Sequence, residues 1–272
     1  MRNRRRFAVP WSPILTLLVA LLPVLSACGR GREDGSVVLR FLERPDQGGG
    51  WSEIIQAFEA ANPNIDVQLV EGPSATDTRE SMYATAMLAG QDVYDLIFMD
   101  VIWVPKFASR QWLLPLDDLL PPSEREAFFP GDIEGSIYEG KLYRIPVRSD
   151  AGVLFYRSDL VPAPPQTFEE LDALARSVAQ PPERWGFVFQ GTQYEGLVCT
   201  FLEVLWGHGG DLLDSQGGVV LDRPEGVAAL RWLASTVGRI APPAVMTYQE
   251  EESRQAFQEG RAVFLRNWPY VW

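Results

Sequence analysis

Tyr94-Asp-Leu-Ile-Phe-Met-Asp-Val-Ile-Trp103 is the stretch of sequence that decides the fold. Leu96 to Met99 are continuously apolar, which is typical of a strand buried on both faces of a parallel sheet. The run ends at Asp100, and Trp103 follows three residues later. Ligands of open α/β sheets bind at the carboxyl ends of strands, so this acid and indole are candidates to hold a polar ligand with a flat apolar face. The alternative is that Asp100 caps the next turn and Trp103 packs on the sheet.

Strand and helix patterns alternate on the amino-terminal side of this stretch. Apolar and β-branched runs predict strands at Val37 to Leu42 and Ile65 to Val70. Helical spacing of apolar residues predicts helices at 51–61 and at 76–90. Strand, helix, strand, helix, strand at this spacing is a doubly wound α/β pattern.

A second set of elements follows the stretch. Gly140 to Pro146 reads as a hairpin edge, and Thr167-Phe-Glu-Glu170 is a capping box that opens a helix. Strands are predicted at 153–156, 185–189 and 262–265, and helices at 168–179, 194–206, 224–237 and 250–259. A chain of 272 residues with this content predicts two lobes or domains.

The first 28 residues read as a lipoprotein signal peptide. Arg2 to Arg6 form a basic start, and the apolar run from Ile14 to Leu25 is shorter than the roughly 20 residues that span a membrane. Leu25-Ser-Ala-Cys28-Gly29 looks like a bacterial lipobox, in which Cys28 is lipidated. The alternative is an ordinary signal peptide with an incidental cysteine. Residues 29–36 are polar and glycine-rich, as expected of a tether.

Charge and cysteine content exclude several classes of function. The formal net charge is −12, and loss of the four leader arginines would leave 20 basic against 36 acidic residues. Such a surface repels phosphate backbones, so nucleic acid is not an expected partner. Cys199 and His208 are the single cysteine and histidine after the leader, and no zinc-ligand spacing is present. We expect no metal and no cofactor.

Several motifs along the chain resemble the sugar-binding lipoproteins of bacterial ABC importers, and most closely their trehalose/maltose-binding branch. The motifs occur in family order and are 98–103, 112–117, 140–146, 150–157, 185–191, 193–199 and 266–270. The resemblance implies a two-lobe periplasmic-binding-protein-like fold of the Venus-flytrap type, with doubly wound lobes that close on a sugar. It implies lobe 1 at 37–147 plus 263–272 and lobe 2 at 148–262. Family members continue well beyond the motif in which this chain stops, so both lobes are expected to be incomplete and the C-terminal part missing.

The resemblance also implies the ligand-binding residues. Asp100 and Asp150 would accept hydrogen bonds from sugar hydroxyls, and Trp268 and Tyr270 would stack on pyranose rings. Charge-assisted hydrogen bonds and flat aromatic faces are suited to those tasks. Turn formation by Asp150 and core packing by the two aromatics are the alternatives. Glu195 faces either the cleft or solvent. Arg148-Ser149 stands where the branch tends to have an aromatic residue, so this subsite is a place where the sugar could differ.

The sequence therefore predicts a monomeric, non-catalytic binding protein, lipid-anchored outside the cytoplasm, that delivers a di- or oligosaccharide to the membrane subunits of an ABC importer. Two other classes stay open. Paired carboxylates with aromatics also suit a secreted glycoside hydrolase, and the acidic residues would suit a binding protein for another small polar solute. A binding protein would return its disaccharide intact.

Overall fold

The computed structural model describes residues 36–46 and 49–272. The predicted signal peptide, Cys28 and nearly all of the tether lie outside the described residues. Within the described part of the chain, no helix has the length and apolar content needed to cross a membrane.

The first sheet has three parallel strands in the order β2-β1-β3. They are β1 (Val37–Glu43), β2 (Ile65–Glu71) and β3 (Leu96–Ile97). The crossovers between them are α1 (Gly50–Ala61) and α2 (Thr76–Leu88). The doubly wound pattern that the sequence predicts is confirmed in this lobe.

β3 differs from the prediction of a strand buried on both faces. It has two residues, it pairs only with β1 along the described chain, and the Leu96 side chain is 47% exposed. β3 lies at the edge of the sheet, so no neighbouring strand covers its outer side. The prediction of a parallel strand at 96–99 is confirmed for Leu96 and Ile97, and the prediction that it is buried on both faces is wrong.

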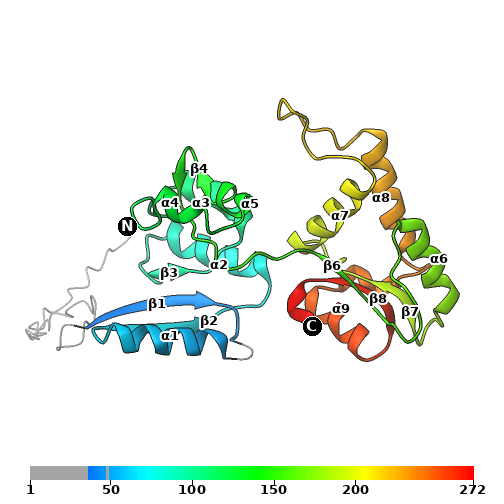
Figure 1. Ribbon diagram of the computed structural model, residues 1–272, viewed down its shortest axis with the longest axis horizontal. Helices are drawn as coiled ribbons and strands as arrows, with labels where there is room; N and C mark the ends of the chain where they lie inside the picture. Colours follow the sequence, from blue (N-terminus) through cyan, green and yellow to red (C-terminus); the bar gives the residue numbers. More distant parts are fainter. Residues whose placement is uncertain (1–35, 47–48) are drawn as a thin grey trace, which may run out of the picture.

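In Figure 1 the rest of lobe 1 lies on the β3 side of this sheet. Its elements are η1 (Val101–Trp103), α3 (Val104–Ser109), α4 (Pro122–Arg125), α5 (Pro130–Glu134) and the hairpin β4 (Ile137–Tyr138) and β5 (Lys141–Leu142). The core of lobe 1 is formed by Leu42, Tyr83, Trp103 and Phe107.

The second sheet belongs to lobe 2 and has the order β6-β8-β7. β8 (Ala262–Asn267) is fully buried between β6 (Val153–Tyr156), which is antiparallel to it, and β7 (Trp185–Val188), which is parallel. The helices are α6 (Phe168–Val178), α7 (Glu195–Gly207), α8 (Pro224–Thr236) and α9 (Glu250–Gln258), with 3-10 turns η2 (Pro243–Thr247) and η3 (Pro269–Val271).

The position of β8 corrects the predicted division into lobes. Residues 263–272 were expected in lobe 1, but β8 is the central strand of lobe 2. Its six residues are all buried, and their backbone groups bond to strands on both sides. An apolar strand of this kind is most stable in the middle of a sheet, because both of its edges are then paired.

Figure 1 shows lobe 1 and lobe 2 side by side, joined by the linker at residues 143–152. The start of α7 and the carboxy-terminal turn η3 lie on the side of lobe 2 that faces lobe 1. The carboxyl ends of β1 and β3 in lobe 1 therefore face the start of α7 and the carboxyl end of β8 in lobe 2.

Candidate functional site

Asp100 follows β3 and begins the turn η1. One of its carboxylate oxygens accepts a hydrogen bond from the backbone N–H of Ile102 at 3.2 Å, and the residue is half-buried. Asp100 is thus a cap, as the simpler reading of the sequence expected. A carboxylate has four lone-pair positions, so capping leaves it able to accept further hydrogen bonds.

Trp103 does not belong to the candidate site. Its side chain is only 3% exposed, and its ring lies 6.1 Å from that of Tyr83 and 5.9 Å from that of Phe107, measured between centroids. The turn that Asp100 caps directs the indole back into lobe 1. The expectation that Trp103 contacts the ligand is therefore wrong, since no open ring face is available.

Glu195 opens α7 on the side of lobe 2 that faces lobe 1. The thiol of Cys199, one turn along the helix, donates to a carboxylate oxygen of Glu195 at 2.6 Å. Burial raises the pKa of Glu195, and the negative charges of Asp100, Glu250 and Asp77 raise it further. Asp100 and Asp77 belong to lobe 1, so acidic groups from both lobes act on one another across the site.

Tyr194 is buried immediately before Glu195, at 9% exposure. Its hydroxyl lies next to the carboxylate of Glu250, and the phenol packs so close to Gly196 that a Cβ there would be 2.2 Å from the hydroxyl oxygen. Burial raises the pKa of Tyr194, with a further contribution from Glu250. Only glycine at position 196 permits this placement of the phenol.

Trp268 follows β8 and is half-buried. Its indole N–H donates to a carboxylate oxygen of Glu250 at 3.5 Å, and the guanidinium carbon of Arg266 lies 4.1 Å from its ring centroid. Arg266 is in turn held by an ion pair with Glu203. One face of the indole is therefore covered by a fixed cation, and the opposite face is the one that a sugar ring could use.

Tyr270 lies in η3 and is 40% exposed. Its hydroxyl donates to a carboxylate oxygen of Glu251 at 2.7 Å, while the guanidinium of Arg44 from lobe 1 lies over its ring at 5.4 Å. The phenol is oriented at both ends, which suits a stacking platform.

Asp150 lies in the linker and is exposed. It forms an ion pair with Arg148 at 3.7 Å, and Arg148 also reaches Glu43 at 3.8 Å and the ring of Phe98 at 4.9 Å. Glu43 is almost fully buried at the end of β1. Arg148 thus ties the linker, including Asp150, to the end of β1 in lobe 1. No interaction recorded among the described residues joins Asp150 to Glu195, Trp268 or Tyr270.

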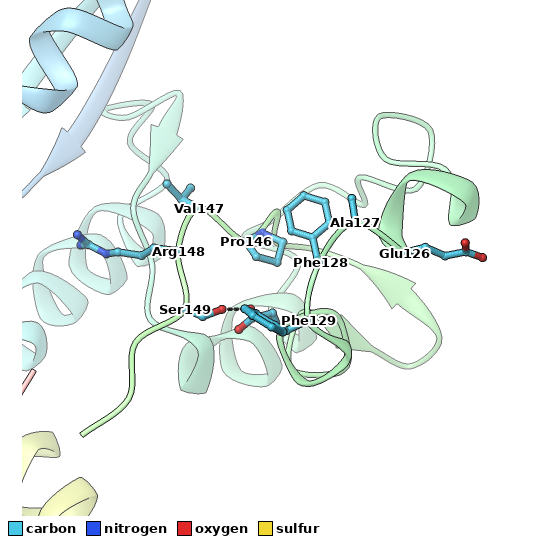
Figure 2. Close-up of a pocket in the computed structure, with 9 residues that line it drawn as sticks. Glu126, Ala127, Phe128, Phe129, Pro146, Val147, Arg148 and Ser149 are labelled. Atoms are coloured by element: carbon cyan, nitrogen blue, oxygen red, sulfur yellow. Dashed lines mark hydrogen bonds between the residues drawn. The ribbon is translucent and has the colours of Figure 1, made fainter. Parts of the chain in front are cut away.

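A separate hollow of about 420 Å³ lies between the linker and α5 (Figure 2). Phe128, Phe129 and Pro146 form its apolar side, and Ser149 donates a hydrogen bond to Asp132 at its edge. Arg148 and Ser149, the predicted subsite positions, line this hollow, whereas Asp100, Asp150, Glu195, Trp268 and Tyr270 do not.

Sequence reasoning missed Glu250, Tyr194 and Arg266. In the sequence, Glu250 is an ordinary acidic residue at the start of a predicted helix, and Arg266 is one position of the 266–270 motif. Tyr194 stands next to Glu195, and its neighbour Gly196 was the one available signal that a ring packs tightly there. None of these residues has a pattern that marks it as a ligand contact before the fold is known.

The fold and site define the class of protein: two α/β lobes with acidic side chains from both lobes, and aromatic side chains from lobe 2, on the sides that face one another. Residues 43–272 match the model of the bacterial extracellular solute-binding protein family, and the chain belongs to that family. It is a solute-binding family and not a family of enzymes.

Similar proteins agree with this assignment. The chain is 37% identical over 217 residues to a probable ABC transporter-binding protein of Deinococcus radiodurans and 25% identical over 244 residues to the maltotriose-binding protein of Pyrococcus abyssi. These matches cover 76% and 89% of this chain. Among solved structures, maltose-bound T. maritima MalE3 is similar with a TM-score of 0.80 and 37% identity, over 87% of this chain.

The chain spans about half the length of the curated relatives that it matches, 51% and 50% for the two above, and 62% of the T. maritima structure. The two-lobe fold is confirmed by these similarities.

Proposed function

We propose that the protein binds a di- or oligosaccharide of the maltose or trehalose type between its lobes and delivers it to an ABC importer. The observation that carries this proposal is the opposition of Asp100 in lobe 1 to Glu195, Glu250 and Trp268 in lobe 2. Carboxylates orient hydroxyl groups, and the Trp268 ring would offer the face opposite Arg266 to the C–H face of a sugar ring. The maltose and maltotriose named for two similar proteins support this ligand class.

Each site residue has a task in this proposal. Asp100 and Glu195 accept hydrogen bonds from hydroxyls on opposite sides of the sugar, so the ligand draws the lobes together. Trp268, held by Glu250 and Arg266, supplies the stacking face, and Tyr270 a second one. Asp150 approaches from the linker, where its ion pair with Arg148 must be shared with the ligand or broken.

The partner and location follow from the same assignment. The membrane subunits of an ABC importer would receive the sugar, and lipid on Cys28 would hold the monomeric protein at the outer side of the cell membrane. The family description, extracellular solute-binding protein, supports an extracytoplasmic location. Intact-mass analysis of membrane-bound protein tests the anchor: an unmodified Cys28 would contradict it, and Cys28→Ser should release the protein.

Calorimetric titration with maltose, trehalose and monosaccharides tests the ligand class. We expect heat of binding for at least one disaccharide, a higher melting temperature with ligand, and recovery of the intact disaccharide by chromatography. Hydrolysis of the disaccharide would contradict a binding role. Glu195→Gln should weaken binding of the disaccharide. The matched control is Glu183→Gln, which changes an exposed acid before β7 and should leave binding unchanged.

A further inference from the structure

Arg266, which covers one face of Trp268, is fixed at all three of its guanidinium nitrogens. Its Nε donates to a carboxylate oxygen of Glu203 at 2.9 Å, its Nη2 donates to the other oxygen, and its Nη1 donates to the Gln190 side-chain oxygen at 2.7 Å. Arg266 is only 5% exposed, and its guanidinium carbon lies 4.1 Å from the Trp268 ring centroid. A guanidinium held at three points is a rigid plane, so Trp268 packs on a surface that has little freedom to move.

Gln190 also holds the backbone of Arg266. It is completely buried, and its side-chain amide nitrogen donates to the carbonyl oxygen of Arg266 at 3.2 Å and to the Ser253 hydroxyl at 2.9 Å. The Ser253 oxygen, on α9, accepts a further hydrogen bond from the side-chain amide of Asn267 at 3.2 Å. The two residues that precede Trp268 are therefore bonded to the interior of lobe 2.

The linker ends directly on the ion pair between Glu203 and Arg266. Gly152 precedes β6, in which Leu154 is the register partner of Arg266. A Cβ atom on Gly152 would lie 1.9 Å from a carboxylate oxygen of Glu203 and 2.8 Å from Nη2 of Arg266, which is too close for either atom. A free carboxylate would rotate away at little cost, but rotation here would break its two bonds to Arg266. Only glycine at 152 allows the linker to lie against the intact ion pair.

The other end of the linker is joined to lobe 1. The Ser149 hydroxyl donates to the Asp132 carboxylate of α5, and Arg148 reaches the buried carboxylate at the end of β1 at 3.8 Å. Gly152 lies only three residues after Ser149. A movement of one lobe relative to the other therefore acts on the chain next to Gly152, where it packs on the ion pair.

We propose that Glu203 and Arg266 are positioning residues, which couple the linker at Gly152 to the stacking face of Trp268. This inference rests on the proposed function, because that face is the one offered to the sugar ring. The linker sets the Glu203 carboxylate, the carboxylate sets the Arg266 plane, and the plane sets the indole. Coupling between two sites is reciprocal, so a sugar stacked on Trp268 favours the linker conformation that orients the ring.

Gly152→Ala tests the coupling without removing a polar group. We expect it to weaken binding of maltose or trehalose about 5- to 20-fold in calorimetric titration, because the displaced Glu203 carboxylate releases Arg266. A thermal melt checks that the variant is folded. Gly131→Ala is the matched control, since a Cβ there meets no atom within 4 Å and affinity should not change. Equal affinities of Gly152→Ala and the unmodified protein would overturn the proposal.

A double substitution distinguishes coupling to the ring from a general loss of structure. Once Trp268→Ala has removed the indole, adding Gly152→Ala should cause no further loss of affinity. An equal loss with and without the indole would mean that the added methyl group acts elsewhere, and it would overturn the coupling. Arg266→Lys should behave like Gly152→Ala, because lysine keeps the charge but cannot form the planar set of bonds.

Fluorine NMR of protein labelled with 5-fluorotryptophan observes the ring without any ligand. The resonance of Trp268 is the one that is missing in Trp268→Ala. We expect it to shift or broaden in Gly152→Ala and to stay in place in Gly131→Ala; an unchanged resonance in Gly152→Ala would overturn the coupling while sugar binding stands. If the resonance responds as expected but no sugar binds to the unmodified protein, the proposed function is overturned and the coupling between linker and ring stands.

Discussion

The guanidinium of Arg44 lies 5.4 Å from the ring centroid of Tyr270, so that the end of β1 in lobe 1 is in contact with η3 of lobe 2. The two residues are far apart in sequence, and the Tyr270 hydroxyl is fixed by Glu251. A cation over an aromatic ring at a partly exposed site contributes about 0.5–1 kcal/mol. The contact therefore restrains the lobes weakly and can be exchanged for contacts with a ligand.

Arg44→Ala should release this restraint. We expect a larger radius of gyration in small-angle X-ray scattering without ligand, together with a stability loss of about 0.5–1 kcal/mol. The matched control is Arg110→Ala, which removes a cation over Trp112 at 5.2 Å inside lobe 1. Equal changes in radius for the two variants would show that Arg44 does not link the lobes.

Asp100→Asn should separate capping from ligand binding. Asparagine caps helical turns about as well as aspartate, so the melting temperature should change little. Loss of the charge should weaken sugar binding by about 1–3 kcal/mol, roughly 5- to 150-fold. Calorimetric titration and a thermal melt on the same sample check both statements. Unchanged affinity with a lowered melting temperature would assign Asp100 to capping alone.

Trp103 and Trp268 should respond in opposite ways to replacement by alanine. Trp268→Ala removes a half-buried indole at the proposed site, so we expect a loss of about 2–4 kcal/mol in sugar affinity with little loss of stability. Trp103→Ala empties a position in the lobe 1 core and should cost about 3–5 kcal/mol of unfolding free energy.

Trp206→Ala is the control for these two variants. Trp206 is 55% exposed near the end of α7, eleven residues beyond Glu195 and thus roughly 16 Å along the helix axis. It should change neither affinity nor stability strongly. Unfolding of the Trp268→Ala variant without ligand would mean that this indole is a core residue.

Helices and strands of both lobes could be predicted where the spacing of apolar residues within a short segment determines the element. The alternating run at 65–70 and the apolar faces of α2 and α7 follow from spacing alone, and the observed β2, α2 and α7 start and end within a few residues of their predicted limits. The assignment of β8 to a lobe was not predictable in this way, because strand pairing joins residues more than a hundred positions apart.

The site was predictable only in part, for a related reason. Asp100 and Trp103 are equally plausible ligand contacts in sequence, and the turn η1 decides which of them faces the core. Glu250 can raise the pKa of Glu195 only once α7 and α9 have both packed in lobe 2. Residue types indicate what a side chain can do, but its partners depend on the tertiary arrangement.

Glu195 also predicts how stability depends on pH. Burial raises its folded-state pKa above the ordinary 4.5, and the carboxylates of Asp77, Asp100 and Glu250 add to this, while the Cys199 thiol acts in the opposite direction. The folded state therefore holds the proton more tightly than the unfolded state. Well below pH 4.5 both states are protonated and Glu195 has no effect on stability. Between pH 4.5 and the raised pKa the unfolded state loses its proton first, so stability falls over that range and stays lower above it.

Glu195→Gln should remove this cost. The variant should melt at a higher temperature than the unmodified protein at pH 7, and the difference should disappear as pH falls toward 4.5, where the wild-type carboxyl is also neutral. Each kilocalorie per mole corresponds to about 2–4 °C in a protein of this size, so a scanning-calorimetry series between pH 4 and 8 resolves the effect. Glu183→Gln, at an exposed position before β7, should show no such divergence. A variant that melts lower than the wild type at pH 7 would mean that the Glu195 charge stabilises the folded protein and that burial does not penalise it.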